Sequence, residues 1–278
     1  MDSLFITKAD GTQERFRVGK LETSLKRAGA SRDEMREIVS RITASLTNGM
    51  KTQEIYRRAF ELLRESNDPV AAKYSLRRAV FNLGPTGFPF EDFLGKLFEA
   101  QGYKTKRRLL IKGKCATHEI DLAAYSPAHS FVAEAKFHAQ PGLKSDLQVA
   151  LYSHARFLDL RDEKICKGDQ CGIVSLKVIT NTKFTDAAVK YAECSGIELL
   201  SWEYPKHNSL HDLIERFNVY PLTVLTRLSS GQKQSLLQSG AILCSDLLKT
   251  PERLGDVRIQ GTRAREVLDE AAGLCAIK

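Results

Sequence analysis

Two apolar runs near the middle of the chain carry charged residues inside them, in the stretch "HEIDLAAYSPAHSFVAEAKFH" at residues 118–138. Asp121 interrupts the first run, and Glu134 and Lys136 interrupt the second. An isolated ion in an apolar strand interior loses hydration worth on the order of several kcal/mol or more, so these positions require a partner or a function. This stretch constrains the fold most, because it demands neighbouring strands with a shared polar face.

The turn residue Pro127 separates the two runs, so we expect them to form an adjacent antiparallel pair of strands. Side chains alternate between the two faces along a strand. Asp121 therefore shares a face with Glu119, and Glu134 shares a face with Lys136 on the next strand. With so short a connection, Asp121 and Glu134 can lie close together, and Lys136 comes next on the same face.

Two carboxylates that converge on one point repel each other unless a cation lies between them, and Mg2+ prefers oxygen ligands of this kind. A bound divalent cation polarises a phosphoryl oxygen and lowers the pKa of a coordinated water, while a nearby ammonium stabilises the developing charge. The pattern therefore suits metal-assisted hydrolysis of a phosphodiester. The alternative is a cross-strand salt bridge on an exposed sheet face, worth under about 1 kcal/mol.

The flanking segments add a helix, "FPFEDFLGKLFEAQGYK", a strand, "TKRRLLIKGKCA", and a late run, "GIVSLKVITNTKFTDAAVKYAECSGIELLSW". Over roughly residues 88–204 this order resembles the PD-(D/E)xK nuclease superfamily, in particular the Mrr-like restriction endonucleases. The resemblance implies a restriction-endonuclease-like αβββαβ core in which Asp121, Glu134 and the helical acid Glu91 hold Mg2+ or Mn2+ and Lys136 orients the attacking water. On the following helix, the expected DNA-facing residues are Lys144, Gln148, Tyr152, His154 and Arg156.

The N-terminal part reads as a β-hairpin followed by helices, and it ends at the Gly/Pro-rich break "NLGPTGFP" at 82–89. Asp10-Gly11 within "LFITKADGTQERF" favours a type I′ turn. Helical patterns are expected at 19–29, 31–46, 52–64 and 69–81, and Ser31 with Glu34 forms a capping box at the start of the second. The basic residues of this part either cradle a triphosphate or are solvated charges on a small helical domain, and their spacing alone leaves both alternatives open; they are Lys8, Lys20, Arg77 and Arg78.

"ITKADGTQERFRVGKLETSLKRAG", "MKTQEIYRRAFELL" and "DPVAAKYSLRRAV" together resemble the ATP-cone, a nucleotide-sensing module, over residues 4–82. The resemblance implies binding of ATP or dATP as a regulatory ligand by Lys8, Glu14, Lys20, Thr52, Tyr56, Arg77 and Arg78. Ala9 stands where the family usually has a second basic residue. Either Arg15 or Arg17 supplies that charge, or phosphate binding is weaker; a cone that has lost its ligand is the remaining alternative.

The C-terminal part, residues 206–278, contains "LLQSGAILCSDLL" and "LGDVRIQGTRAREVL". Both are similar to helix-hairpin-helix units, whose turns present backbone N–H groups to phosphate and so position DNA without reading its bases. A plain helical oligomerisation bundle is the alternative.

A chain of 278 residues suggests two or three domains. We expect a mixed α/β (α+β) protein with an ATP-cone at 1–84, a nuclease-like domain at 88–205 and an all-α module at 206–278. The net charge of +8 favours an anionic partner. The cysteines are expected to be reduced thiols of a cytoplasmic protein, and no apolar run is long enough to span a membrane.

The resulting hypothesis is a Mg2+-dependent DNA endonuclease of restriction or defence, regulated by ATP or dATP and assembled as a homo-oligomer. Its partners would be DNA and an adenine nucleotide, with no membrane. The rival hypotheses are a nucleotide-responsive DNA-binding regulator and an oligomeric scaffold with a vestigial nuclease fold.

Overall fold

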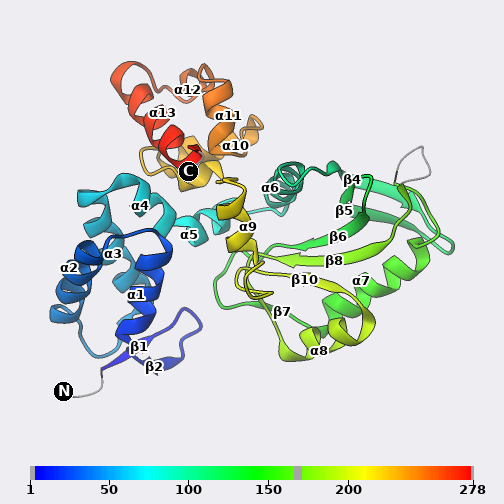
Figure 1. Ribbon diagram of the computed structural model, residues 1–278, viewed down its shortest axis with the longest axis horizontal. Helices are drawn as coiled ribbons and strands as arrows, with labels where there is room; N and C mark the ends of the chain where they lie inside the picture. Colours follow the sequence, from blue (N-terminus) through cyan, green and yellow to red (C-terminus); the bar gives the residue numbers. More distant parts are fainter. Residues whose placement is uncertain (1–3, 166–170, 277–278) are drawn as a thin grey trace.

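Three packed parts follow one another along the chain, as the computed structural model in Figure 1 shows. The structure describes residues 4–165 and 171–276. A mostly helical N-terminal part lies beside a five-stranded sheet, and a set of C-terminal helices packs against the first part. The prediction of a mixed α/β fold is confirmed at this level. Within the described ranges, none of the helices is both long enough and apolar enough to cross a membrane.

The N-terminal part contains a small three-stranded sheet and five helices. Ser31 caps the second helix as predicted, because its side chain accepts from the Glu34 N–H and the Glu34 side chain returns to the Ser31 N–H. The expected helix at 69–81 is divided at Ser75. The elements are β1 (Phe5–Thr7), β2 (Gln13–Arg15), α1 (Val18–Arg27), α2 (Arg32–Ala44), β3 (Met50–Lys51), α3 (Thr52–Ser66), α4 (Asp68–Tyr74) and α5 (Leu76–Phe81).

The turn between β1 and β2 differs from the predicted type I′ turn. Gly11 has a positive φ of 82°, but Asp10 is not among the described residues with positive φ, and a type I′ turn needs both. The Gly11 N–H donates to the Lys8 carbonyl and the Lys8 N–H donates to the Thr12 carbonyl. These bonds close a three-residue loop with glycine at its left-handed position, which is the next most common hairpin connection.

The central part is built on a sheet with the strand order β10-β8-β6-β5-β4. The pairs β4–β5 and β5–β6 are antiparallel, as predicted for the latter, whereas β6–β8 and β8–β10 are parallel. Gly102, at φ 90°, ends the helix that precedes the sheet. The elements are α6 (Phe88–Glu99), β4 (Lys104–Lys112), β5 (Thr117–Tyr125), β6 (Ser130–Lys136), β7 (Lys144–Ser145), α7 (Leu147–Leu160), β8 (Ser175–Thr180), β9 (Lys183–Phe184), α8 (Asp186–Ser195) and β10 (Glu198–Leu200).

Both faces of this sheet are covered. Leu122 and Phe131 face a core shared with α6 and the C-terminal helices, whereas Ala123 and Val132 face a second core beneath α7 and α8. The alternation along β5 and β6 therefore assigns each side chain to one layer. Cys171 is disulfide-bonded, so the expectation that all cysteines are reduced is wrong for this residue.

The C-terminal part is joined to the N-terminal part by specific contacts. Thr223 Oγ1 donates to the Ala79 carbonyl at 2.6 Å, and Arg227 pairs with Asp68 at 2.5 Å. One continuous core runs from α4 and α5 through α6 into these helices. The elements are α9 (Leu210–Arg216), a 3-10 turn (Leu222–Val224), α10 (Ser230–Gln238), α11 (Cys244–Lys249), α12 (Arg253–Asp256) and α13 (Gly261–Cys275).

The turn between α10 and α11 does not offer the phosphate-binding amides that the sequence suggested. The N–H groups of Ile242 and Leu243 both donate to Asp246 Oδ2 at 2.9 Å. The next amide, of Cys244, donates to the Tyr220 carbonyl, and Cys244 is fully buried. These amides are satisfied inside the protein, so this hairpin stabilises the module rather than presenting donors to DNA.

Candidate functional site

The register of β5 and β6 brings the two strand carboxylates together. The ladder pairs Ala123 with Val132 and Leu122 with Ala133, so the next step places Asp121 across from Glu134. There the ladder ends, and Asp121 Oδ2 accepts a hydrogen bond from the Ala135 N–H at 2.7 Å. The Asp121 side chain therefore takes the place of a backbone acceptor where the strands part.

Glu91 approaches the same region from α6 and is buried, with 7% of its surface exposed. Its Oε2 pairs with Arg108 Nη1 at 3.2 Å. Arg108 lies on β4 across from Asp121, because its neighbours Arg107 and Leu109 pair with the two residues on either side of Asp121. Arg108 adopts a positive φ of 52°. A positive φ at a long side chain is uncommon. Here it accompanies a guanidinium that also reaches Asp92 at 3.0 Å.

The three carboxyl groups act on one another electrostatically. Burial raises the pKa of Glu91, and the charge of Asp121 raises it further. Burial likewise raises the pKa of Asp121. The pKa of Glu134 is raised by burial and then by Asp121, with a smaller contribution from Glu91. Mutual repulsion of this kind is what an added cation would relieve.

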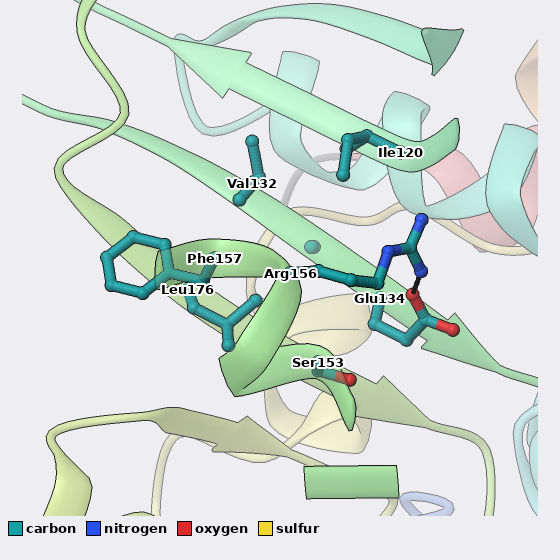
Figure 2. A pocket seen from close by; sticks show the side chains of 8 residues that line it. Ile120, Val132, Glu134, Ser153, Arg156, Phe157 and Leu176 are labelled. Carbon is teal, nitrogen blue, oxygen red and sulfur yellow. Dashed lines mark hydrogen bonds and ion pairs between the residues drawn. The ribbon is translucent and has the colours of Figure 1, made fainter. Parts of the chain in front are cut away.

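Arg156 is the cation that pairs with Glu134 (Figure 2). It projects from α7 toward the sheet, and its Nη1 lies 2.5 Å from Glu134 Oε2. Only 11% of the Arg156 side chain is exposed, and its Nε is buried without a hydrogen-bond partner. The guanidinium lies 5.2 Å from the centre of the Tyr152 ring. Its charge lowers the pKa of Glu134, against the effect of burial.

The sequence suggested that Arg156 and His154 face DNA, and the structure places both differently. Arg156 pairs with Glu134, and His154 Nδ1 lies 2.8 Å from the Tyr191 hydroxyl on α8. Each contact occupies one nitrogen of its side chain with a protein partner. Arg156 lies one helical turn after Tyr152, on a helix that was expected to cover the sheet. Its pairing with Glu134 depends on which side of that helix faces the sheet, and the sequence alone does not determine this.

Lys136 is exposed at the end of β6, and its charge lowers the pKa of Glu134. The residues that follow it are held in place by Asn181, which is fully buried. Asn181 Oδ1 accepts from the His138 N–H and Asn181 Nδ2 donates to the His138 carbonyl, both at 2.8 Å. This pair of bonds fixes the backbone directly beyond Lys136. Burial, followed by the charge of Lys136, lowers the pKa of His138.

No group of three or more His, Cys, Asp or Glu side chains within the described ranges could by itself hold a metal ion. The pair Asp121 and Glu134 is a smaller donor set. Each carboxylate has one oxygen held by a protein donor, and its second oxygen has no hydrogen bond from any described residue. Mg2+ is commonly held by one or two carboxylates together with water and phosphate oxygens. The pair fits such a cation, with Glu91 adding charge nearby.

The N-terminal part brings three of the predicted nucleotide-binding residues together. Glu14 on β2 lies between two lysines, with Lys8 Nζ and Lys20 Nζ each 2.9 Å from its carboxylate. Hydrogen bonds from Lys8 and then Lys20 lower the pKa of Glu14. The parallel pairing of β1 with β3 matches Thr7 with Lys51, so Thr52 starts α3 at the level of Lys8. The hairpin and the start of α3 thus form one basic end.

The other predicted residues of this module lie further along it. Tyr56 stacks on Tyr74 with ring centres 5.1 Å apart, and burial raises its pKa to about 12. Arg78 is near enough to Tyr56 to oppose that rise. Arg77 instead lies 6.0 Å from the Trp202 ring, against the central part. Arg77 therefore contacts the neighbouring domain rather than the lysines of the hairpin.

Comparison with known families identifies two parts of the chain. Residues 4–80 match the ATP cone domain, as the sequence indicated. Residues 220–275 match the family described as AF1548-like, C-terminal. An ATP-cone and an AF1548-like C-terminal domain are therefore both present in the protein.

A relative from Archaeoglobus fulgidus, named only as an uncharacterized protein, is 34% identical over 179 residues, which are 64% of this chain and 97% of the relative. A crystal structure titled as a protein of unknown function, AF1548, is 31% identical, with a TM-score of 0.56, and covers 68% of this chain and 98% of its own. The chain belongs to the AF1548-like family. About a third of it lies outside the region shared with these relatives.

Proposed function

We propose that the protein is a deoxyribonuclease that hydrolyses phosphodiester bonds of DNA with Mg2+ or Mn2+ and responds to ATP or dATP. The observation that carries this proposal is the β5–β6 register, which sets Asp121 across from Glu134 with Lys136 two residues further along β6. The order α6, β4, β5, β6, α7, β8 supports it, since a helix, three antiparallel strands, a helix and a parallel strand is the arrangement expected of a restriction-type nuclease core.

Asp121 and Glu134 would hold the cation through the oxygens that no described donor occupies, while Ala135 and Arg156 fix the other oxygens. A cation bound there supplies charge neutralisation at a phosphoryl oxygen and a coordinated water of lowered pKa. Lys136, exposed on the same strand, donates to the attacking water and stabilises the charge that develops on the phosphate. Glu91 contributes negative charge from α6 and is itself held by Arg108.

The ATP-cone supplies the regulatory half of the proposal. Lys8 and Lys20 are held by a single carboxylate, so a nucleotide phosphate can replace Glu14 as their partner. Adenine nucleotide binding would then change the hairpin end of the module. DNA is the substrate that the excess of basic residues favours, and pairing of two copies would let a single-site nuclease cut both strands.

One observation favours a second candidate function. Arg156 already neutralises Glu134 through a largely buried ion pair. A site that carries its own cation suits a nucleotide-responsive DNA-binding regulator, or an oligomeric scaffold, that keeps the fold without cleavage. The two candidates differ in whether an added divalent cation reaches Glu134.

Incubation of the purified protein with supercoiled plasmid and Mg2+, with and without ATP or dATP, tests the proposal. We expect both Glu134→Ala and Glu134→Gln to abolish nicking, because each removes a carboxylate that would hold the cation. Glu134→Ala also leaves the largely buried Arg156 without its partner. Glu134→Gln, which keeps an oxygen for Arg156 Nη1, is therefore the variant expected to retain the circular dichroism spectrum. Glu119→Gln is a matched control, since it removes an exposed carboxylate from β5 and should leave cleavage intact. Cleavage by Glu134→Ala at the wild-type rate would refute the assignment, and no cleavage by the wild type in any condition would favour the regulator.

A further inference from the structure

We infer that the ATP-cone acts on the carboxylate site through the segment that directly follows Lys136, residues 137–145. The linker that leaves the cone contacts this segment at one point, and the tip of the cone's hairpin contacts it at another. The first contact is Gly84 against Phe137, and the second is the Asp10 turn against Gly142. The inference rests on the proposed nucleotide-regulated function and specifies how that regulation reaches the site.

The first contact is made by the linker directly after the cone. A Cβ built on Gly84 would lie 2.6 Å from a ring atom of Phe137, so a larger residue there would require the ring to move. The same ring packs against Phe90 of α6 with centres 5.6 Å apart. Phe137 is the neighbour of Lys136, so the linker after the cone bears on the end of β6.

The second contact is at the tip of the hairpin that carries Lys8. A Cβ built on Gly142 would lie 3.5 Å from Asp10 Cβ and 3.8 Å from the Asp10 N. Gly142 has a positive φ of 98°, which favours glycine at the point where the hairpin approaches. Figure 1 shows the β1–β2 hairpin reaching toward the chain that leaves β6.

Between these contacts the segment is anchored on the central part. Asn181 binds both backbone groups of His138, and His138 Nε2 lies 3.1 Å from Ser145 Oγ. The stretch 139–144 is exposed and joins the two anchors. A displacement at Gly142 therefore acts on the short stretch between His138 and Ser145, and His138 is only two residues from Lys136.

The nucleotide site and the hairpin tip belong to one turn. The Lys8 backbone bonds to Thr12 and Gly11, and Asp10 Oδ1 accepts from the Thr12 N–H at 2.9 Å. A nucleotide that shifts the Lys8 backbone as the Lys8 side chain leaves Glu14 for a phosphate would therefore also shift Asp10. Away from the hairpin tip, Arg27 of the cone pairs with Glu203 at 3.5 Å, and Lys183 of the central part pairs with the same carboxylate at 3.2 Å.

A reversible cross-link tests the second contact. The 3.5 Å between Asp10 Cβ and a Cβ at Gly142 is at the short end of the Cβ separations found in disulfides. The double variant D10C/G142C should therefore form a disulfide under mild oxidation and lose it in dithiothreitol. The matched controls are each single cysteine variant and the wild type treated alike, because Cys115 and Cys194 are exposed free thiols. The single variant G142C, measured in reductant, shows how much the added side chain alone disturbs the protein at this positive φ, without the cross-link.

Two measurements are made on the full-length protein, in oxidised and in reduced form. Hydrogen exchange of residues 137–145 should respond to ATP in the wild type and in the reduced double variant, and should stop responding in the oxidised one. ATP affinity, measured by calorimetry, should fall about five-fold or more on oxidation and recover on reduction, because coupling between sites is reciprocal.

Failure of D10C/G142C to oxidise would overturn the contact, and ATP that binds without altering exchange of residues 137–145 in the wild type would overturn the coupling. Equal ATP affinity of the oxidised and reduced forms would also overturn it, as would no ATP binding at all. An ATP response that depends on the cross-link in a protein that cuts no DNA would support the coupling and refute the nuclease assignment instead. The two proposals therefore fail separately.

Discussion

Replacing Arg156 by glutamine should destabilise the protein by leaving Glu134 and Asp121 facing each other without their cation. Unit charges about 4 Å apart interact by about 4 kcal/mol at an effective dielectric constant of about 20, and desolvation offsets part of this. Loss of one partner from a buried pair costs about 3–5 kcal/mol. The two side chains are 11% and 21% exposed, so we expect the lower end, about 3 kcal/mol at pH 8.

The loss should depend on pH in a defined direction. The pKa of Glu134 is raised by burial and by Asp121, and removal of Arg156 raises it further. A carboxyl group with a raised folded-state pKa costs stability as the pH rises from its unfolded value through its folded value. The destabilisation of Arg156→Gln should therefore be largest at pH 8 and should shrink toward pH 5, where the carboxyl group gains a proton.

Thermal and urea unfolding at both pH values measure this effect. About 3 kcal/mol corresponds to a fall of about 6–12 °C in the midpoint. Arg161→Gln, an exposed arginine just after α7, is the control and should stay within about 0.5 kcal/mol of the wild type.

Mg2+ should restore Arg156→Gln by up to about 2.7 kcal/mol at 100 times its dissociation constant. An Arg156→Gln protein as stable as the wild type at pH 8 would refute the electrostatic reasoning. Equal stabilisation by Mg2+ after the further changes Asp121→Asn and Glu134→Gln would refute the cation site.

Two further outcomes are expected. Lys8→Ala and Lys20→Ala should each weaken ATP binding by about 1.5–3 kcal/mol in calorimetry, because each removes a charge-assisted contact, and unchanged affinity in both would contradict the nucleotide site. A hydrogen bond from His118, followed by those from the N–H groups of Ala116 and Cys115, lowers the pKa of Asp159 from its ordinary 3.8 to about 2. The Asp159 carboxylate therefore stabilises the turn between β4 and β5 when the pH is above 3.8. Asp159→Asn should lower the melting temperature at pH 7, and the difference from the wild type should vanish as the pH falls to about 2; a difference that does not change with pH would count against it.

The parts of the fold predicted from sequence were those fixed by local patterns. The capping box at Ser31, the glycine that ends α6 and the antiparallel pair of β5 and β6 each follow from residues near one another in the chain. The placement of Asp121 across from Glu134 follows from the same short connection. Alternation along a strand needs no tertiary information.

The features that sequence did not predict depend on how distant elements pack. Glu134 and Arg156 are 22 residues apart. Their pairing requires α7 to cover the face of the sheet that carries Glu134 and to be turned about its own axis so that Arg156 points toward that face. The sequence also did not predict that Arg77 lies against the Trp202 ring of the central part. The two-residue strand β3 was missed because so short a run carries no periodic signal.

The continuous core that joins α4 and α5 to the C-terminal helices limits how this protein can be divided. The sequence boundary after residue 84 and the family boundary at residue 220 both cut through side chains that pack on one another, including Leu76, Val80 and Leu236. A cone excised at residue 84 would carry an uncovered apolar surface and would be prone to aggregate.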